Sequence, residues 1–146
     1  MTAILNTSAA VGFGTVVKTV PGFAALTEVL LNVPGTPLIS EAIAVNLLAG
    51  ATGSASGGMS IALEALGEKY LQIAMETGIS PEAFHRVASL ASGGLDTLPH
   101  NGAVLTLLAV TGLTHKDSYI DVMMTSLVIP IVASIPAIIL GSIGIY

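Results

Sequence analysis

The stretch AIAVNLLAGATGSASGGMSIAL, residues 42–63, decides the fold class, because it is largely apolar, carries no charge and yet has glycines at its centre. Its twenty-two residues are enough for one membrane crossing, since about 20 helical residues span the hydrocarbon core. Four glycines fall within residues 50–58, and each costs about 1 kcal/mol in a helix interior. The stretch therefore predicts a helix over residues 42–49, a break over residues 50–58 and a resumed helix over residues 59–66.

A second interrupted helix is predicted over residues 81–113. Ser80 followed by Pro81 is typical of a helix start, with the serine as N-cap and the proline at the first helical position. The sequence SGGLDTLPHNG, residues 92–102, holds three glycines and a proline and should end this helix. A helix resumes over residues 103–113, and residues 114–117 resemble a capping box that opens the next one.

The last 25 residues, 122–146, carry no charge and predict the plainest membrane-spanning helix. Pro130 and Pro136 should kink this helix without preventing it, because neighbouring helices can bond the freed carbonyl groups. A partial apolar run covers residues 3–17, and residues 67–78, which hold the densest charge, are predicted to form an interfacial helix and loop. The chain is therefore predicted to be an all-α, polytopic membrane protein with discontinuous (broken or re-entrant) helices.

The composition also favours a lipid bilayer as the surroundings of this chain. Hydrophobic residues make up 53% and charged residues 9%, whereas about 25% charged residues are usual in soluble domains. Four Lys and Arg against nine Asp and Glu give no basic footprint, so we expect no nucleic acid as a partner. The absence of cysteine excludes disulfides and thiolate metal sites. Because no His–Glu pair has zinc-protease spacing, we expect no metal and no cofactor.

The two predicted breaks point to a binding site. Non-helical backbone persists at membrane depth only where protein buries it or where it lines a water-filled cavity. Secondary transporters use such breaks to turn half-helix N-termini, with their free N–H groups, toward an anionic substrate. A flexible surface loop or close helix packing is the alternative explanation for the glycine-rich stretches. The substrate-binding candidates are the hydroxyl, amide and glycine residues of the two breaks: Thr52, Gly53, Ser54, Ser56, Gly57, Thr97 and Asn101.

Asp96 and His100 are the candidates for proton coupling. Asp96 lies within the largely apolar residues 87–114, and an ionisable group at membrane depth is functional by default. A compatible alternative is that Asp96 caps the half-helix that starts near Leu98. His100 could relay a proton, or its ring could hold the backbone in a purely structural role. Glu41 and Glu64, which flank the first interrupted helix, are interpreted as interfacial residues.

Three segments carry a resemblance to a known family: residues 40–60, SEAIAVNLLAGATGSASGGMS, residues 86–102, RVASLASGGLDTLPHNG, and residues 11–23, VGFGTVVKTVPGF. They resemble the gluconate permease family, bacterial symporters that include gluconate and D-beta-hydroxybutyrate permeases. The resemblance implies proton-coupled uptake of a small hydroxy-acid anion by a multi-pass protein of the bacterial cytoplasmic (inner) membrane. It also implies that residues 1–146 form a single membrane-domain fragment that matches the C-terminal third of such a permease. A missing N-terminal part of the permease would then hold the other half of an inverted repeat.

Other classes of function fit the sequence less well. A small structural or pore-forming membrane subunit, with a homo-oligomer as one form, would account for the short length. An enzyme is not expected, because the chain has no Gly-x-Ser-x-Gly elbow and no P-loop Gly-Lys-Ser/Thr. No basic residue precedes the first apolar run, so we expect no secretory signal and a chain that is a piece of something longer.

Overall fold

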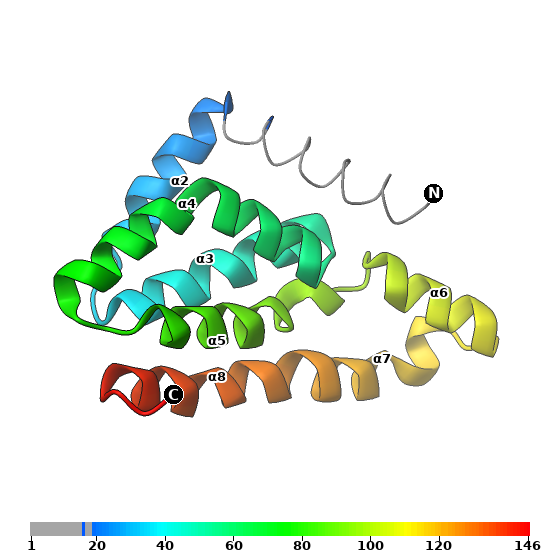
Figure 1. The fold of residues 1–146 in the computed structure, drawn as a ribbon. Helices are drawn as coiled ribbons and strands as arrows, with labels where there is room; N and C mark the ends of the chain where they lie inside the picture. The colour runs from blue at the N-terminus through cyan, green and yellow to red at the C-terminus, as the bar shows by residue number, and fades with distance from the viewer. Residues whose placement is uncertain (1–15, 17–18) are drawn as a thin grey trace, which may run out of the picture.

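The computed structural model describes residue 16 and residues 19–146, and most of these residues are helical (Figure 1). No β-strand occurs within those residues, so the predicted all-α class is confirmed for them. The apolar run expected over residues 3–17 lies, apart from Val16, outside the described residues. The elements in chain order are α2 (Pro21–Leu31), α3 (Pro37–Thr52), α4 (Ala55–Thr77), α5 (Pro81–Ser92), the 3-10 turn η1 (Leu95–Thr97), α6 (Gly102–Thr111), α7 (His115–Met123), the π-helical turn η2 (Met124–Val128) and α8 (Ile129–Ser142).

Helices α3, α4 and α5 pack together and bury the core, and α8 lies alongside α5 (Figure 1). Helix α3 also contacts α2, α8 and η1, so it is the element that the others surround. Helices α6 and α7 lie together at one end of the molecule (Figure 1). The largest fully buried apolar side chains all come from α3, α4 and α5, namely Leu38, Val45, Ile61, Leu66 and Val87.

The turn between α3 and α4 is much shorter than the predicted break over residues 50–58. Helix α3 runs through Thr52, Gly53 adopts the left-handed conformation with φ 61°, and Ser54 caps α4. Only two residues are therefore non-helical, and the later glycines belong to α4. A Cβ on Gly58 would lie 2.2 Å from the Cα and N of Ala49, so this glycine lets the two helices approach closely. The predicted break was therefore too long, and the alternative explanation of close helix packing holds for Gly58.

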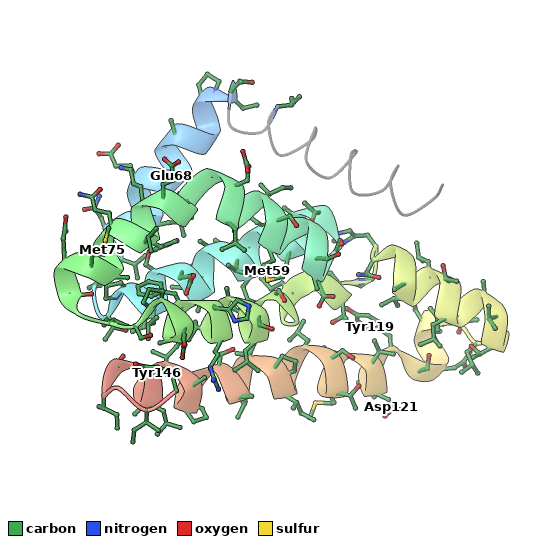
Figure 2. The ribbon with its side chains drawn as sticks, in the orientation of Figure 1. Met59, Glu68, Met75, Tyr119, Asp121 and Tyr146 are labelled. Atoms are coloured by element: carbon green, nitrogen blue, oxygen red, sulfur yellow. The ribbon has the colours of Figure 1, made fainter. Side chains whose placement is uncertain are left out.

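Helix α4 continues without interruption through the residues 67–78 that were predicted to form an interfacial helix and loop. It ends at Thr77, where Gly78 takes the left-handed conformation with φ 73°. On one side of this second half of α4, Tyr70 and Ala74 are buried, whereas Glu68 and Met75 point outward (Figure 2). The buried side supplies the packing that holds the charged segment in the helix.

The start of α5 agrees with the prediction, since the Ser80 hydroxyl accepts a hydrogen bond from the N–H of Glu82 and Pro81 is the first helical residue. Helix α5 ends at Ser92, and α6 begins at Gly102 with Asn101 as its N-cap. The non-helical and 3-10 residues between them therefore fall inside the predicted range 92–102. The capping box that was predicted at residues 114–117 is also present, with the Asp117 carboxylate accepting hydrogen bonds from the N–H and hydroxyl of Thr114.

Helices α7, η2 and α8 follow one another without a gap, so His115–Ser142 forms one helical stretch of 28 residues. Among the described residues this is the one helix long and apolar enough to cross a membrane, whereas α3 and α6 are apolar but shorter. The described residues thus contain one clear candidate for a membrane-spanning helix, whereas several were predicted. The π-helical turn comes directly before Pro130, whose ring would meet the carbonyl four residues earlier in a regular α-helix.

Candidate functional site

The α3–α4 turn and the α5–α6 connection lie against each other. The side-chain amide of Asn101 donates a hydrogen bond to the Gly53 carbonyl, at 2.7 Å between N and O. The Nε2 atom of His100 lies 3.0 Å from the Gly50 carbonyl oxygen. The two stretches that the sequence singled out, almost fifty residues apart, are therefore one site in space, which we call the turn junction and define as residues 50–57 and 93–101.

Asn101 joins the two segments of the turn junction through hydrogen bonds of its side chain. Its side-chain oxygen accepts hydrogen bonds from the backbone N–H groups of Ala103 and Val104, which caps α6. Its side-chain nitrogen donates to the carbonyls of Gly53 and Asp96. The residue is only 4% exposed. Because both donors and both lone-pair positions are in use, Asn101 is held as a structural member of the site.

The N-terminus of α4 faces the α5–α6 connection. The hydroxyl of Ser54 accepts a hydrogen bond from the N–H of Gly57 at 3.1 Å, as an N-cap does. The carboxylate of Asp96 lies close enough to the N–H of Ala55, the first residue of α4, for that group to stabilise its negative charge, as do the N–H groups of Asp96 itself and Thr97. An acidic side chain therefore occupies the positive end of the α4 dipole.

Asp96 lies in η1, and its second carboxylate oxygen has a different environment. The Oδ1 atom is buried and has no hydrogen-bond partner among the described residues. The alternative role predicted for Asp96, capping the following half-helix, is wrong, because Asn101 caps α6. Asp96 instead lies near the start of α4, a helix that begins some forty residues before it. The unpartnered Oδ1 is a position where a proton could attach.

The remaining predicted polar site residues lie within hydrogen-bond range of groups of the chain itself. Thr52 donates its hydroxyl hydrogen back into its own helix, with the Leu48 carbonyl 2.8 Å away. Ser56 is exposed, with its hydroxyl oxygen 3.5 Å from that of Ser54. The hydroxyl of Thr97 lies 3.5 Å from the Gly94 carbonyl, at the long limit of a hydrogen bond. The contact of His100 with a backbone carbonyl agrees with the structural alternative for its ring.

Three residues that the sequence reasoning did not assign to the site hold the α5–α6 connection in place. The Asn46 side-chain oxygen on α3 accepts a hydrogen bond from the N–H of Leu95 at 3.1 Å. From α7, the Tyr119 hydroxyl donates to the Thr97 carbonyl at 3.1 Å (Figure 2), and His115 Nε2 lies 3.1 Å from the Pro99 carbonyl oxygen. Asn46 could have been identified, because an amide in an apolar helix needs a partner. The other two could not, because their spacing from the site follows no motif.

A Cβ on Gly94 would lie 1.9 Å from the side-chain oxygen of Asn46. Glycine at this position therefore allows the α5–α6 connection to sit on α3. A Cβ on Gly50 would likewise lie 2.8 Å from the Cβ of Leu95. The glycines of both stretches thus serve close approach between α3 and η1. Within the described residues, no group of three or more His, Asp or Glu side chains is placed to hold a metal ion.

Comparison with known proteins indicates transport. Over 126 residues, 86% of its length, the chain is 53% identical to the "Uncharacterized transporter YxjC" of Bacillus subtilis (strain 168). This chain resembles a bacterial transporter. It spans 27% of the length of that relative, so it corresponds to about a quarter of the longer protein. No family model matches the chain, and no solved structure matches it. The similarity supports a membrane transporter in general, while the substrate and the coupling ion belong to the proposal that follows.

Proposed function

We propose that the chain is a segment of a secondary active transporter that takes up gluconate, or a related small hydroxy-acid anion such as D-beta-hydroxybutyrate, together with protons. The observation that carries the proposal is the carboxylate of Asp96 at the N-terminus of α4, inside the turn junction. The similarity to a bacterial transporter and the apolar helix His115–Ser142 support it. The bacterial cytoplasmic membrane is the proposed location, in a multi-pass arrangement.

The mechanism is an exchange of one carboxylate for another at the start of α4. Ionised Asp96 lies beside the N–H of Ala55 and therefore occupies the place at the positive end of the α4 dipole where a substrate carboxylate would bind. A proton on the unpartnered Oδ1 neutralises Asp96 and weakens its hold on that N–H. The substrate carboxylate then replaces it, with the hydroxyls of Ser54 and Ser56 close by. Binding of the anion thus requires binding of the proton, which is the condition for symport.

The proposed membrane arrangement follows from the same elements. Helices α3 and α4, and helices α5 and α6, act as two discontinuous pairs whose connections meet at the turn junction. Apolar side chains on α8, among them Val132 and Ile139, are exposed in this chain and face lipid or the remainder of the transporter. That remainder, the N-terminal part of the permease, holds the other half of an inverted repeat, and self-association of the complete protein is compatible with it.

The test is uptake of labelled gluconate and hydroxybutyrate by the complete protein that contains this segment, in membrane vesicles with and without a proton gradient. We expect Asp96→Asn to abolish the stimulation of uptake by the gradient, while exchange of internal for external substrate persists. Asp121→Asn is the matched control, because Asp121 is exposed on α7 (Figure 2). Gradient-driven uptake that is unchanged in Asp96→Asn contradicts the proposed role of Asp96, and no uptake of either anion by the unaltered protein contradicts the substrate class.

The alternative is a small structural or pore-forming subunit, and the exposed apolar side chains of α6 and α8 are the observation that favours it. Those side chains would then be covered by further copies of the chain. Reconstitution of the 146-residue chain alone separates the two functions. A discrete oligomer in mild detergent, with an ion leak through liposomes that no hydroxy acid changes, supports the subunit and opposes the carrier.

A further inference from the structure

Glu41 is a buried acid far along α3 from the turn junction. It lies in the first turns of α3, whereas Thr52 ends the helix, so about 16 Å of helix separates them at 1.5 Å per residue. Glu41 is 2% exposed, and its Oε2 atom is buried without a hydrogen-bond partner among the described residues. The interpretation of Glu41 as an interfacial residue did not include this burial by protein. An ionised carboxylate in such a place would be costly, because burial of an unpaired charge is strongly unfavourable.

A pocket between α4 and α5 leads to Glu41. Its volume is about 220 Å³, which is room for several water molecules at about 30 Å³ each. Most of its wall is apolar, with Met59, Leu63 and Phe84 among the lining side chains. Glu41 contributes to this wall from α3, and the exposed His85 contributes from α5. The pocket thus joins a buried carboxyl to a surface from which water and protons can enter.

No Lys or Arg side chain of the described residues lines the pocket beside Glu41. Tyr70 on α4 and His85 on α5 are the other titratable residues of the pocket wall. The hydroxyl of Ser40 donates to the Leu30 carbonyl at 2.6 Å, so the Tyr70 hydroxyl, 2.9 Å away, must donate to Ser40. The Tyr70 hydrogen is therefore not free to serve Glu41. Helix α8 has no titratable residue, and α2, which also contacts α3, offers only the exposed Glu28.

We propose that Glu41 is a proton-binding site reached through the pocket between α4 and α5, and that the folded chain holds it as a neutral carboxylic acid. The proton attaches to a carboxylate oxygen and leaves by the same water-accessible route. Loss of the proton places an unpaired negative charge among α3, α4 and α5 and weakens their packing. The site is separate from Asp96, and this inference does not depend on the proposed function.

Infrared spectroscopy of the complete protein in lipid, with and without carbon-13 glutamate, tests the inference directly. We expect the carbonyl band of a protonated glutamate near neutral pH, shifted by the label. The band should be absent in Glu41→Gln and retained in the control Glu68→Gln, because Glu68 is exposed on α4. A band that Glu41→Gln leaves unchanged overturns the proposal. So does the absence of any protonated glutamate in the unaltered protein, which would mean that a basic group elsewhere pairs with Glu41.

Thermal unfolding as a function of pH provides a second readout. We expect the unaltered protein to lose stability relative to Glu41→Gln as the pH rises, because only the unaltered protein can acquire the buried charge. Glu41→Leu should fold as well, since the carboxyl has no hydrogen-bond partner to lose. If both variants fail to fold, the ionised carboxylate is a structural requirement and the proposal is overturned. Parallel stability profiles for the unaltered protein and Glu41→Gln overturn it as well.

Discussion

At the scale of single residues, the glycines of this chain have two different uses that composition alone does not separate. Gly53 and Gly78 end helices in the left-handed conformation. Gly58 lies inside α4 and faces the backbone of Ala49. Gly67 lies in the same helix, and a Cβ there would have no neighbour within 4 Å. The predicted break over residues 50–58 was too long because the partner of Gly58 becomes visible only when α3 and α4 are folded against each other.

The contrast between Gly58 and Gly67 gives a prediction. Gly58→Ala places a methyl group 2.2 Å from the Cα of Ala49, so α3 and α4 must separate, and we expect destabilisation of about 1–3 kcal/mol or more. Gly67→Ala is the control, and we expect it to stabilise by up to about 1 kcal/mol through helix propensity. Denaturant unfolding in detergent micelles measures both. Equal effects of the two substitutions would show that the close approach of α3 and α4 is absent in solution.

Asp96 shows how much of the site the sequence predicted at the residue scale. The apolar surroundings of Asp96 marked it as unusual, and the structure places it at the turn junction with one buried, unpartnered oxygen. Its position near the N–H of Ala55 was not predictable, because no spacing rule connects η1 to the start of α4. Asn101 was selected as a substrate ligand for its polarity, yet its amide is fully used in joining the two connections.

At the scale of elements, local signals predicted the helix starts, and packing decided where helices continue. The Ser80–Pro81 start and the Thr114–Asp117 capping box depend on bonds within a few residues, so the sequence contains them. The second half of α4 carries Glu68, Lys69 and Glu76, which suggested a loop. It stays helical because Tyr70 and Ala74 are buried against the core, and that contact is invisible in a charge pattern.

The π-helical turn η2 is the element whose cause can be tested by a single substitution. Pro130→Ala supplies the missing N–H and removes the ring, so we expect Met124–Val128 to become a regular α-helix. When the extra residue of the π turn is taken into a regular α-helix, α7 rotates against α8 by about 100°. Tyr119 then turns away from the Thr97 carbonyl, to which its hydroxyl now donates at 3.1 Å.

Amide hydrogen exchange over residues 122–130 is the measurement, and we expect slower exchange in Pro130→Ala. Faster exchange over residues 95–101 should accompany it, because the α5–α6 connection loses its bond from Tyr119. Pro136→Ala is the control, since Pro136 lies within α8 and no π turn precedes it. A Pro130→Ala protein with exchange unchanged in both segments would show that the proline is not the cause of the π turn.

At the scale of the whole molecule, the sequence predicted the class but not the number of spans. The length of an uncharged apolar stretch predicts a membrane-crossing helix well when one continuous helix contains that stretch, as in His115–Ser142. The same rule overestimates the number of spans when an uncharged stretch folds back on itself. Residues 42–63 contain the end of α3, a turn at Gly53 and Ser54, and the start of α4, and so do not form one span. The meeting of two distant connections at the turn junction follows from the packing of α3 against α4, α5 and η1, which no local pattern encodes.

The exposed apolar side chains of His115–Ser142 allow a test of whether this helix lies in a lipid bilayer. Val132, 57% exposed, lies near the middle of that helix, and Ile143 lies just past its end. If the helix crosses the bilayer, Val132→Lys should cost about 2.5–3.5 kcal/mol of insertion free energy, whereas Ile143→Lys should cost little because its amine reaches the interface. Glycosylation mapping of the inserted fraction measures both variants. In water the two substitutions would be equivalent, since each replaces an exposed apolar side chain. Equal insertion of Val132→Lys and Ile143→Lys would therefore contradict a membrane crossing by this helix and, with it, the placement of the turn junction at membrane depth.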